Sequence, residues 1–347
     1  MKRIAALLAA LLCLSGCSGS GNVCSTDFFA MDTFMSIAVC GEGAGDSEAA
    51  QELATELEQR VNVLEPALSR TREDSDLYRL NHAEGAVCTV AEDTYAAIAD
   101  AVEYAKLTGG AFDPTMAALT DLWGINTEDA RVPSQNEIEQ ALSGVGYENI
   151  ELLGDGRVRL LNGAQLDLGG IGKGFATDEV KAAWEQRDRS GTWSVLARLG
   201  GNVGAFGENP DRDGGNWVVG IADPDNSADY LATVAVKDLS VVTSGDYERY
   251  FEQDGKRYHH IFDPATGYPA ESGLRSVTVI DESSTRADAL TTALFVMGLE
   301  EGMMFCAENQ IAAVFITADR QVYTTQQVGE LCTFSFLGEE KGYTYAQ

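Results

Sequence analysis

The 347-residue sequence is poor in basic residues: 24 lysines and arginines stand against 54 aspartates and glutamates, giving a formal net charge of −30. Nucleic-acid binding requires a basic surface, so this composition argues against DNA or RNA as a partner. It suits an exported domain that anionic lipids repel, and it carries no information about the fold.

Cysteines occur without metal-binding spacing, since none of the seven forms a CxxC pair. This spacing argues against a zinc site. If Cys13 leaves with a leader segment and Cys17 is lipidated, an odd number remains. One or two disulfides could then form outside the cell, but the sequence does not determine the pairing.

Long apolar runs are also missing at the start of the chain. Two basic residues precede an apolar run over residues 4–12, far shorter than the roughly 20 residues of a membrane span. The run leads into LSGC, which resembles the bacterial lipoprotein cleavage box. We therefore predict a lipoprotein signal peptide over residues 1–17, lipidation at Cys17 and a flexible tether over residues 18–27. An ordinary secretory signal is the alternative.

Two or more acyl chains hold a protein stably on a bilayer, whereas one does not. We therefore expect an exported protein that is lipid-anchored to the outer face of the cell membrane or to a periplasmic membrane face.

A glycine-rich stretch, LDLGGIGKGFATD over residues 166–178, organises the chain. Its first residues predict a short strand over 166–168, and those after Phe175 predict a helix. Glycines beside Lys173 leave backbone groups open to a ligand, and a helix N-terminus favours an anion. The stretch therefore indicates a site for a phosphate-bearing molecule, or for a metal beside one.

Two common phosphate-binding motifs do not match this stretch. The P-loop requires Ser or Thr after its lysine, but Gly174 follows Lys173. The dinucleotide fingerprint requires a glycine at the position that Phe175 holds. A purely structural glycine-rich corner is therefore an equally good interpretation of this stretch alone.

The remaining pattern mixes helices and strands. Helical spacing predicts helices over residues 47–64, 94–108 and 134–142. Strands are predicted over residues 28–39 and as pairs near 150–168 and 217–243. Residues 68–81 are polar and broken, which is typical of a loop. Runs of strands among the helices favour an α+β fold over a doubly wound sheet.

Two later segments carry candidate groups. Residues 199–207 form a second glycine patch, which we interpret as a tight turn or β-bulge rather than a ligand contact. Residues 258–269 contain His259 and His260, a candidate base or metal site. The alternative is that turns built by Asp-Pro and Thr-Gly explain this segment and that the histidines are incidental.

A last helix is predicted from a cap at Ser284 or Thr285 to an end at Gly298. Asp288 and Thr292 share one face of this helix. A carboxylate and a hydroxyl are ligands that suit Mg²⁺. Taken alone, however, the pair is better explained by a helix-start carboxylate and a backbone-bonded threonine.

Taken together and in this order, these segments resemble the ApbE family of FAD:protein FMN transferases, from Met31 to about Gly298. The resemblance implies a single α+β domain over residues 28–340, T-fold-like, with two lobes around a nucleotide cleft. It implies Mg²⁺-dependent transfer of FMN from FAD to a Thr or Ser hydroxyl of a partner protein, such as a membrane-bound redox subunit, with release of AMP.

Site residues carry over by position. His260 matches the proposed catalytic base, and the metal ligands match Asp288, Thr292 and the backbone carbonyl of Gly170. The positions that match nucleotide contacts are Met31, Thr71, Ala111, Phe112, Asp113, Asp167, Lys173 and Ile261. Thr71 departs from the pattern, because relatives often carry a tyrosine there that could stack on the flavin.

Two other activities stay open from the sequence. The same site could hydrolyse FAD to FMN and AMP, with water in place of the partner hydroxyl. A lipoprotein that binds a flavin or another solute without catalysis is the second alternative.

Overall fold

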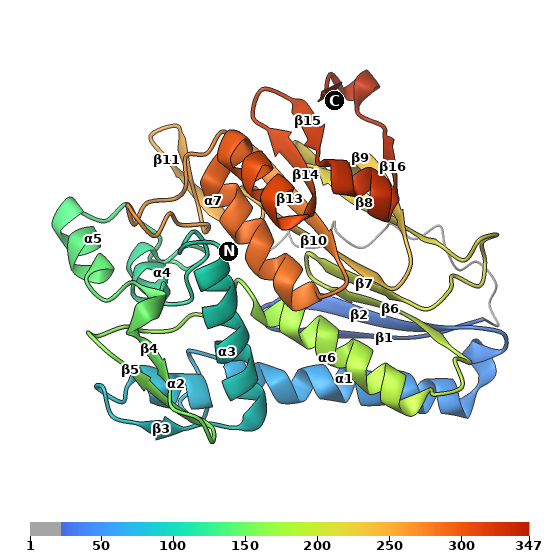
Figure 1. Ribbon diagram of the computed structural model, residues 1–347, viewed down its shortest axis with the longest axis horizontal. Helices are drawn as coiled ribbons and strands as arrows, with labels where there is room; N and C mark the ends of the chain where they lie inside the picture. The colour runs from blue at the N-terminus through green and yellow to red at the C-terminus, as the bar shows by residue number, and fades with distance from the viewer. Residues whose placement is uncertain (1–21, 347) are drawn as a thin grey trace.

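The computed structural model describes residues 22–346 (Figure 1), so the predicted signal peptide, Cys17 and the start of the tether lie outside it. The rest of the predicted tether is not a linker, because strand β1 (Val23–Ala30) begins inside it. The expected single strand over residues 28–39 is a hairpin of β1 and β2 (Thr33–Cys40). Its turn is at Met31 and Asp32, with φ of 49° and 57°, as two-residue hairpin turns require.

Within residues 22–346, nine strands form one sheet in the order β1-β2-β6-β7-β10-β13-β14-β15-β17. Neighbours are antiparallel except for β15 and β17. The further members are β6 (Ser194–Leu199), β7 (Asn202–Phe206), β10 (Leu239–Gly245), β13 (Leu274–Asp281), β14 (Ala312–Thr317), β15 (Gln321–Thr324) and β17 (Thr344–Ala346). A largely antiparallel sheet with segregated helices confirms the α+β prediction.

Three smaller sheets complete the strands of the described chain. They are β16-β9-β8, β3-β5-β4 and the hairpin β11-β12. Their bounds are β3 (Cys88–Thr89), β4 (Ile150–Leu152), β5 (Arg157–Leu160), β8 (Trp217–Asp223), β9 (Asn226–Val236), β11 (Tyr250–Gln253), β12 (Lys256–His259) and β16 (Thr333–Phe336). The antiparallel pairs β4–β5 and β8–β9 confirm the two predicted strand pairs.

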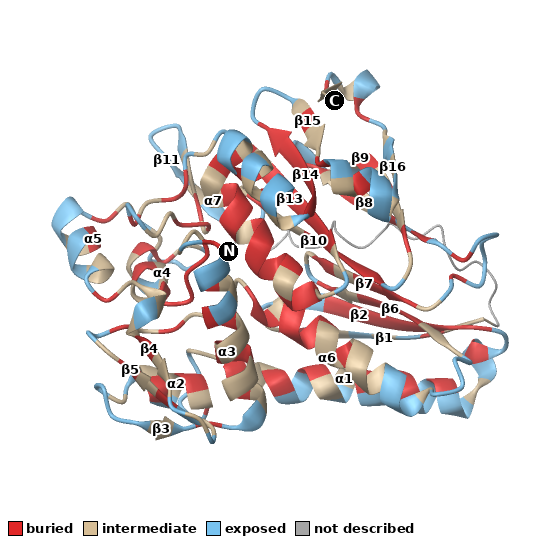
Figure 2. Ribbon diagram, in the orientation of Figure 1, coloured by how far each residue is buried: buried red, intermediate tan, exposed pale blue. Residues whose placement is uncertain are grey.

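The helices of the described chain are α1 (Glu48–Leu68), α2 (Asp76–Asn81), α3 (Glu92–Leu107), α4 (Ala117–Trp123), α5 (Gln135–Leu142), α6 (Gly172–Arg187), α7 (Ser284–Asn309) and α8 (Gln326–Leu331). Helices α1, α6 and α7 pack on one face of the large sheet (Figure 1). Helices α4 and α5 belong to a separate apolar cluster, and Val328 of α8 packs in the cluster on the opposite face. Buried residues alternate with more exposed ones along α1, α6 and α7 (Figure 2), and the buried ones share apolar clusters with residues of the sheet. The β8–β9 pair packs on the opposite face through a separate apolar cluster.

Three predicted helices are confirmed as α1, α3 and α5, but the predicted loop over residues 68–81 is partly wrong. It contains α2, whose N-cap Ser75 accepts a hydrogen bond from the backbone of Tyr78 at 2.9 Å. Leu77 and Leu80 are buried, and two apolar residues in a polar segment give too weak a period to predict a helix.

Helix α7 differs from its prediction at both ends. Its N-cap is Ser283, whose side chain accepts from the Arg286 amide. At Gly298 the backbone leaves helical geometry, with φ 78° and ψ −174°, but a further helical segment follows. A window of α7 has a mean hydropathy of 1.3, enough for a membrane span by composition, yet 50% of that window is buried inside the protein. The apolar composition is therefore that of a core helix.

The described cysteines are Cys24, Cys40, Cys88, Cys306 and Cys332, and no two of them form a disulfide with each other. Cys24 and Cys40 are on adjacent strands, but Cys24 pairs in register with Val39. Their side chains are buried in different apolar clusters, so the possible disulfides do not form among the described residues.

Candidate active site

The glycine-rich stretch begins as an extended loop, so the predicted strand over residues 166–168 is wrong. The Asn81 side chain donates to the Leu166 carbonyl at 2.9 Å and accepts from the Leu166 amide at 2.7 Å. The Asp167 amide donates to the Pro114 carbonyl at 2.8 Å. A side chain and a loop satisfy this backbone in place of a strand ladder. They also bring the 111–115 segment beside the stretch.

Helix α6 starts at Gly172, earlier than predicted, so Lys173 and Gly174 are in its first turn. There it touches α7: the Gly174 amide donates to Oδ2 of Asp288 at 2.8 Å. A Cβ on Gly174 would come within 2.4 Å of the Ser284 carbonyl oxygen and 2.8 Å of Asp288 Cβ. This contact therefore requires glycine, and it directs the buried Asp288 carboxylate to the start of α6.

The three predicted metal ligands come together at this contact. A Cβ on Gly170 would be 3.6 Å from the hydroxyl oxygen of Thr292 and 3.2 Å from the Phe112 ring. Thr292 is one helical turn beyond Asp288 on α7. The Gly170 backbone, the Thr292 hydroxyl and the Asp288 carboxylate thus border one small region.

The donor set is compatible with Mg²⁺. Within residues 22–346, no cluster of three or more His, Cys, Asp or Glu side chains is arranged to hold a metal ion. The Asp288 set instead offers one carboxylate, one hydroxyl and one carbonyl. Mg²⁺ takes few protein ligands and completes its octahedron with water and substrate phosphate.

Lys173 lies beside the same carboxylate, with Nζ 3.8 Å from Oδ1 of Asp288. The hairpin turn between β6 and β7 borders it, since a Cβ on Gly200 would be 3.4 Å from the Lys173 Cδ. A cation at Asp288 would therefore meet a lysine charge nearby. Both positive charges are compatible if an anionic diphosphate binds between them.

His259 has a structural role. Its Nδ1 accepts from the Ile261 amide at 3.3 Å, so its Nε2 donates to the Ala270 carbonyl at 3.1 Å. The ring is buried and meets Phe295 edge-on at 5.4 Å. Burial lowers the pKa of His259. The predicted turn also exists, because the Gly267 amide donates to the Asp263 carbonyl at 2.8 Å.

His260 is placed differently. Its Nδ1 lies 3.3 Å from the Arg249 carbonyl oxygen, and a carbonyl only accepts, so this contact favours a proton on Nδ1 and a lone pair on Nε2. Burial, and after it the charges of Arg249, His259 and Lys173, lower the pKa of His260 to about 3. The ring is therefore neutral at physiological pH, and the positive charge of Lys173 is close enough to affect its pKa.

Glu248 is a site group that the sequence analysis missed. A Cβ on Gly201 would be 3.5 Å from its Oε1. The residue as a whole is exposed, yet desolvation of the carboxyl by surrounding protein raises its pKa to about 7. Lys173 and Arg249 oppose this shift, and Asp288 adds to it. Glu248 follows a Gly-Asp-Tyr turn sequence, and nothing in that pattern marked it.

The predicted nucleotide contacts fall into two groups: residues that border the metal region, and residues whose observed contacts are with other parts of the protein. Phe112 is buried beside Gly170, and Lys173 beside Asp288, so both belong to the metal region. Met31 is in the β1–β2 turn, where its amide donates to Glu65 at 2.9 Å. Ile261 is buried in the α7 cluster, and Ala111 is half-buried with its amide bonded to the Thr108 carbonyl at 3.2 Å.

Asp113 is satisfied within its own loop. Oδ1 accepts from the Thr115 amide at 2.8 Å, and Oδ2 accepts from the Tyr147 amide at 2.9 Å. Burial raises the pKa of Asp113, against these bonds, which lower it. The side chain therefore shapes the loop, and a nucleotide would meet the backbone there.

Asp167 pairs with Arg70, the chain neighbour of Thr71 and another residue that the sequence analysis missed. Nε of Arg70 is 3.2 Å from Oδ2 of Asp167, and its Nη1 bonds Asp121 at 2.5 Å. Thr71 is exposed and 3.3 Å from the Ser69 hydroxyl. Thr71 supplies no aromatic ring at this position, and its chain neighbour Arg70 carries a planar guanidinium.

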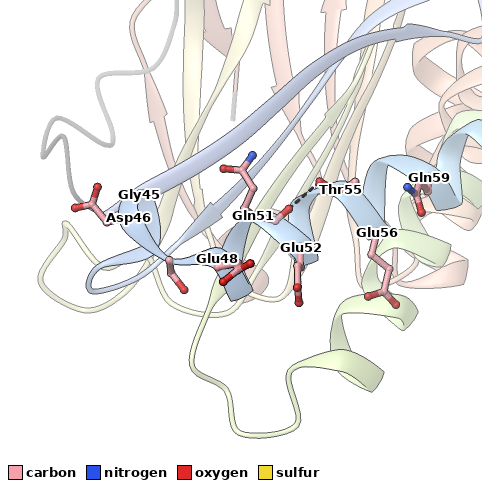
Figure 3. Close-up of a pocket in the computed structure, with 9 residues that line it drawn as sticks. Gly45, Asp46, Glu48, Gln51, Glu52, Thr55, Glu56 and Gln59 are labelled. Atoms are coloured by element: carbon pink, nitrogen blue, oxygen red, sulfur yellow. Dashed lines mark hydrogen bonds between the residues drawn. The ribbon is translucent and has the colours of Figure 1, made fainter.

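A separate hollow runs along the outer face of α1 (Figure 3). Its lining residues are Gly45, Asp46, Ser47, Glu48, Gln51, Glu52, Thr55, Glu56 and Gln59. None is a candidate site residue. Four carboxylates would repel a diphosphate, and two of them, Glu52 and Glu56, lie 3.3 Å from Arg187.

Comparisons with known proteins identify the family of the chain. A sequence model described as the ApbE family matches residues 31–315. A FAD:protein FMN transferase of Treponema pallidum (strain Nichols) is 38% identical over 290 residues, covering 79% of this chain and 78% of that protein. One from Vibrio cholerae is 33% identical over 322 residues, covering 91% and 94%.

Solved structures show the same similarity. The ApbE protein of Thermotoga maritima superposes with a TM-score of 0.81 at 36% identity, covering 89% of this chain and 99% of that one. The apo form of the Pseudomonas stutzeri flavinyl transferase ApbE gives 0.77 at 33% identity, covering 89% and 96%.

Proposed function

The chain belongs to the ApbE family and transfers FMN from FAD to proteins, and on that premise we propose how its residues divide the reaction. The observation that carries the proposal is the meeting of Asp288, Thr292 and Gly170 at the α6–α7 contact, with Lys173 beside them. Four groups suited to a cation and a diphosphate converge there from distant parts of the sequence.

Asp288, Thr292 and the Gly170 carbonyl would hold Mg²⁺. When bound, the ion supplies charge stabilisation for phosphate oxygens, an effect of several kcal/mol. Lys173 supports the same anion from the first turn of α6, where the helix dipole also favours negative charge.

The acceptor is a protein hydroxyl, which we propose to be a Thr or Ser of a membrane-bound redox subunit. The hydroxyl oxygen attacks the phosphorus on the FMN side, the bond to the AMP phosphate breaks, and AMP leaves. The lone pair on Nε2 of His260 takes the hydroxyl proton, a contribution of roughly 10²–10⁴-fold.

A pKa of about 3 makes His260 a weak base before substrate binds. Two of the causes are the positive charges of Arg249 and Lys173. A bound diphosphate would offset both charges and thereby raise the pKa of His260 toward the range of an efficient base. The substrate's own charge thus prepares the residue that activates the acceptor.

The flavin nucleotide would contact Met31, Thr71, Ala111, Phe112, Asp113, Asp167 and Ile261. Phe112, which packs against Gly170, joins this group to the metal region. Asp113 would contribute backbone groups, because its carboxylate is already bonded. Ile261 would contribute only its carbonyl oxygen, because its side chain is buried and its amide already donates to His259. Near Thr71, the Arg70 guanidinium offers a flat surface in place of an aromatic ring.

The test mixes the purified protein, FAD, Mg²⁺ and candidate redox subunits, and follows a fluorescent flavin band through denaturing electrophoresis. The His260→Ala variant should bind FAD with little change but form the band at least 100-fold more slowly. Full transfer by this variant would remove His260 as the base. Omitting the acceptor measures hydrolysis separately, because AMP would then appear without a labelled protein.

We propose further that Cys17 carries lipid and that the exported protein is anchored at a membrane surface. The support is the sequence pattern before it, since this segment lies outside the described residues. Feeding cells a labelled fatty acid should label the wild type but not Cys17→Ala; equal labelling of both would reject the anchor.

The T-fold-like arrangement of two lobes is likewise a proposal. It is supported by a separate apolar cluster around Met116, Trp123, Ile138 and Phe262, distinct from the clusters that pack on the large sheet.

A further inference from the structure

Asp178 joins α6 to the N-terminus of α7. Its Oδ1 accepts from the Ser284 amide at 2.8 Å. Its Oδ2 accepts from the Ser283 hydroxyl at 2.9 Å and from the amide and hydroxyl of Thr285 at 2.9 Å and 2.6 Å. One carboxylate of α6 thus caps the first turn of α7, where negative charge is favoured.

The reverse contact lies one helical turn away. On α6, Gly174 precedes Asp178 by four residues, and its amide donates to Asp288 of α7 at 2.8 Å. On α7, Asp288 follows Ser284 by four residues. Each helix therefore presents a carboxylate to backbone amides of the other. Two such contacts, spaced along both helices, fix the rotation of α7 as well as its distance from α6.

That rotation matters for the proposed cation. Mg²⁺ requires nearly ideal octahedral geometry at roughly 2.0–2.1 Å, whereas Ca²⁺ tolerates flexible geometry at longer distances. A small turn of α7 would move Asp288 and Thr292 together relative to Gly170. Mg²⁺ would then lose affinity before Ca²⁺ does.

We propose that Asp178 is a positioning residue, which holds α7 in the orientation that lets Asp288 and Thr292 meet the Gly170 carbonyl around Mg²⁺. The proposal rests on the proposed metal site. Asp178 itself touches α7 and not the cation.

The test is Asp178→Asn, which keeps the size of the side chain. It replaces one carboxylate oxygen, an acceptor, with an amide NH₂ group that cannot accept from the donors of α7. Glu179→Gln is the matched control: this neighbour pairs with Arg60 of α1, with Nε at 3.0 Å, and within residues 22–346 it forms no hydrogen bond or ion pair with α7. Melting temperature is followed as Mg²⁺ or Ca²⁺ is titrated into each protein with FAD, so no turnover is needed.

In Asp178→Asn the half-saturating Mg²⁺ concentration should rise about tenfold or more, the usual effect of removing a group behind a metal ligand. The Ca²⁺ value should rise less, and Glu179→Gln should match the wild type for both ions. An unchanged Mg²⁺ value, or equal losses for both ions, would overturn the proposal.

If Asp178→Asn does not fold, Thr285→Val removes only one of the four donors and should give a smaller, still Mg²⁺-selective, rise. No rise in that variant would also overturn the proposal. A wild type that binds FAD but does not respond to Mg²⁺ would refute the metal site itself. If the wild type responds to Mg²⁺ and the variant responds equally, only the role of Asp178 is refuted.

Discussion

Two glycine-rich segments, residues 166–178 and 199–207, meet in the structure but use glycine for different physical reasons. In the first, Gly174 has no room for a Cβ because α7 touches it, with the Ser284 carbonyl oxygen only 2.4 Å from the Cβ position. In the second, Gly200 occupies the β6–β7 turn with φ of 65°, a conformation that other residues rarely adopt. Contact between elements explains one glycine, and backbone conformation explains the other.

The comparison also shows that a turn can border a functional site. The interpretation of residues 199–207 as a tight turn is confirmed by the β6–β7 hairpin. Nevertheless Gly200 lies against Lys173, and Gly201 against Glu248. The same glycines therefore form a turn and bring backbone close to Lys173 of the first segment and to Glu248.

The sharpest test of the contact explanation is Gly174→Ala. The added methyl should push α7 away and cost about 1–3 kcal/mol of unfolding free energy, while FMN transfer should fall about 100-fold because the metal ligands move. Gly172→Ala is the control, since its Cβ would meet nothing within 4 Å. Urea unfolding and the flavin-band assay measure both; normal transfer by Gly174→Ala would contradict the explanation.

A second test separates neighbouring hydroxyls on α7. Thr292→Val should raise the half-saturating Mg²⁺ concentration on the order of tenfold, because its hydroxyl faces Gly170. Thr291 instead bonds Ser244 at 2.9 Å and the Asp288 carbonyl at 2.8 Å, so Thr291→Val should chiefly cost about 1 kcal/mol of stability. Equal Mg²⁺ dependence in both variants would contradict the assignment of the metal site to residues 166–178 and Thr292.

A third test addresses the turn. Gly200→Ala places a side chain in left-handed backbone, at a cost of about 1–2 kcal/mol in stability, and Gly200→Asn should cost less because asparagine tolerates that region. Melting curves should show this order, with Mg²⁺ affinity unchanged in both. A loss of Mg²⁺ affinity without a loss of stability would show that this glycine acts through Lys173 and not through the turn.

The smallest expected effect concerns Glu248. Its pKa in the folded state is about 7, above its ordinary value of 4.5, so the folded protein binds this proton more tightly than the unfolded chain. The stability that comes from this proton is complete below pH 4.5 and is lost as the pH rises through 7. Glu248→Gln should therefore melt increasingly above the wild type from pH 4.5 to 7. A difference that is constant with pH would contradict the desolvated carboxyl.

Much of the site was predictable because its signals are local. The four-residue spacing of Asp288 and Thr292 places both on one helical face wherever α7 lies. Lys173 among glycines before a helix marks an anion site by the same kind of argument. The family resemblance suggested which other residues join Asp288, Thr292 and Lys173 in the site, and the sequence comparisons confirmed the family.

Other residues could not be predicted because their roles depend on packing. Glu248 gains its raised pKa from surrounding protein, and Asp178 caps a helix that begins 106 residues later in the chain. Asp113 carries an expected site position, but amides from Thr115 and Tyr147 already satisfy it. The predicted strand over residues 166–168 failed for a similar reason, because a distant Asn81 supplies its hydrogen bonds.

The sequence by itself determined the mixed α+β character, the helical faces and the identity of the oxygen donors, since these follow from residue type and short-range spacing. Only the tertiary structure decided which donors meet, because the α6–α7 contact depends on the missing Cβ of Gly174 and on two carboxylate–amide contacts between segments far apart in the chain. Shifted pKa values, such as the lowered pKa of His260, also depend on the tertiary structure, because desolvation and neighbouring charges act on the side chain only in the folded protein.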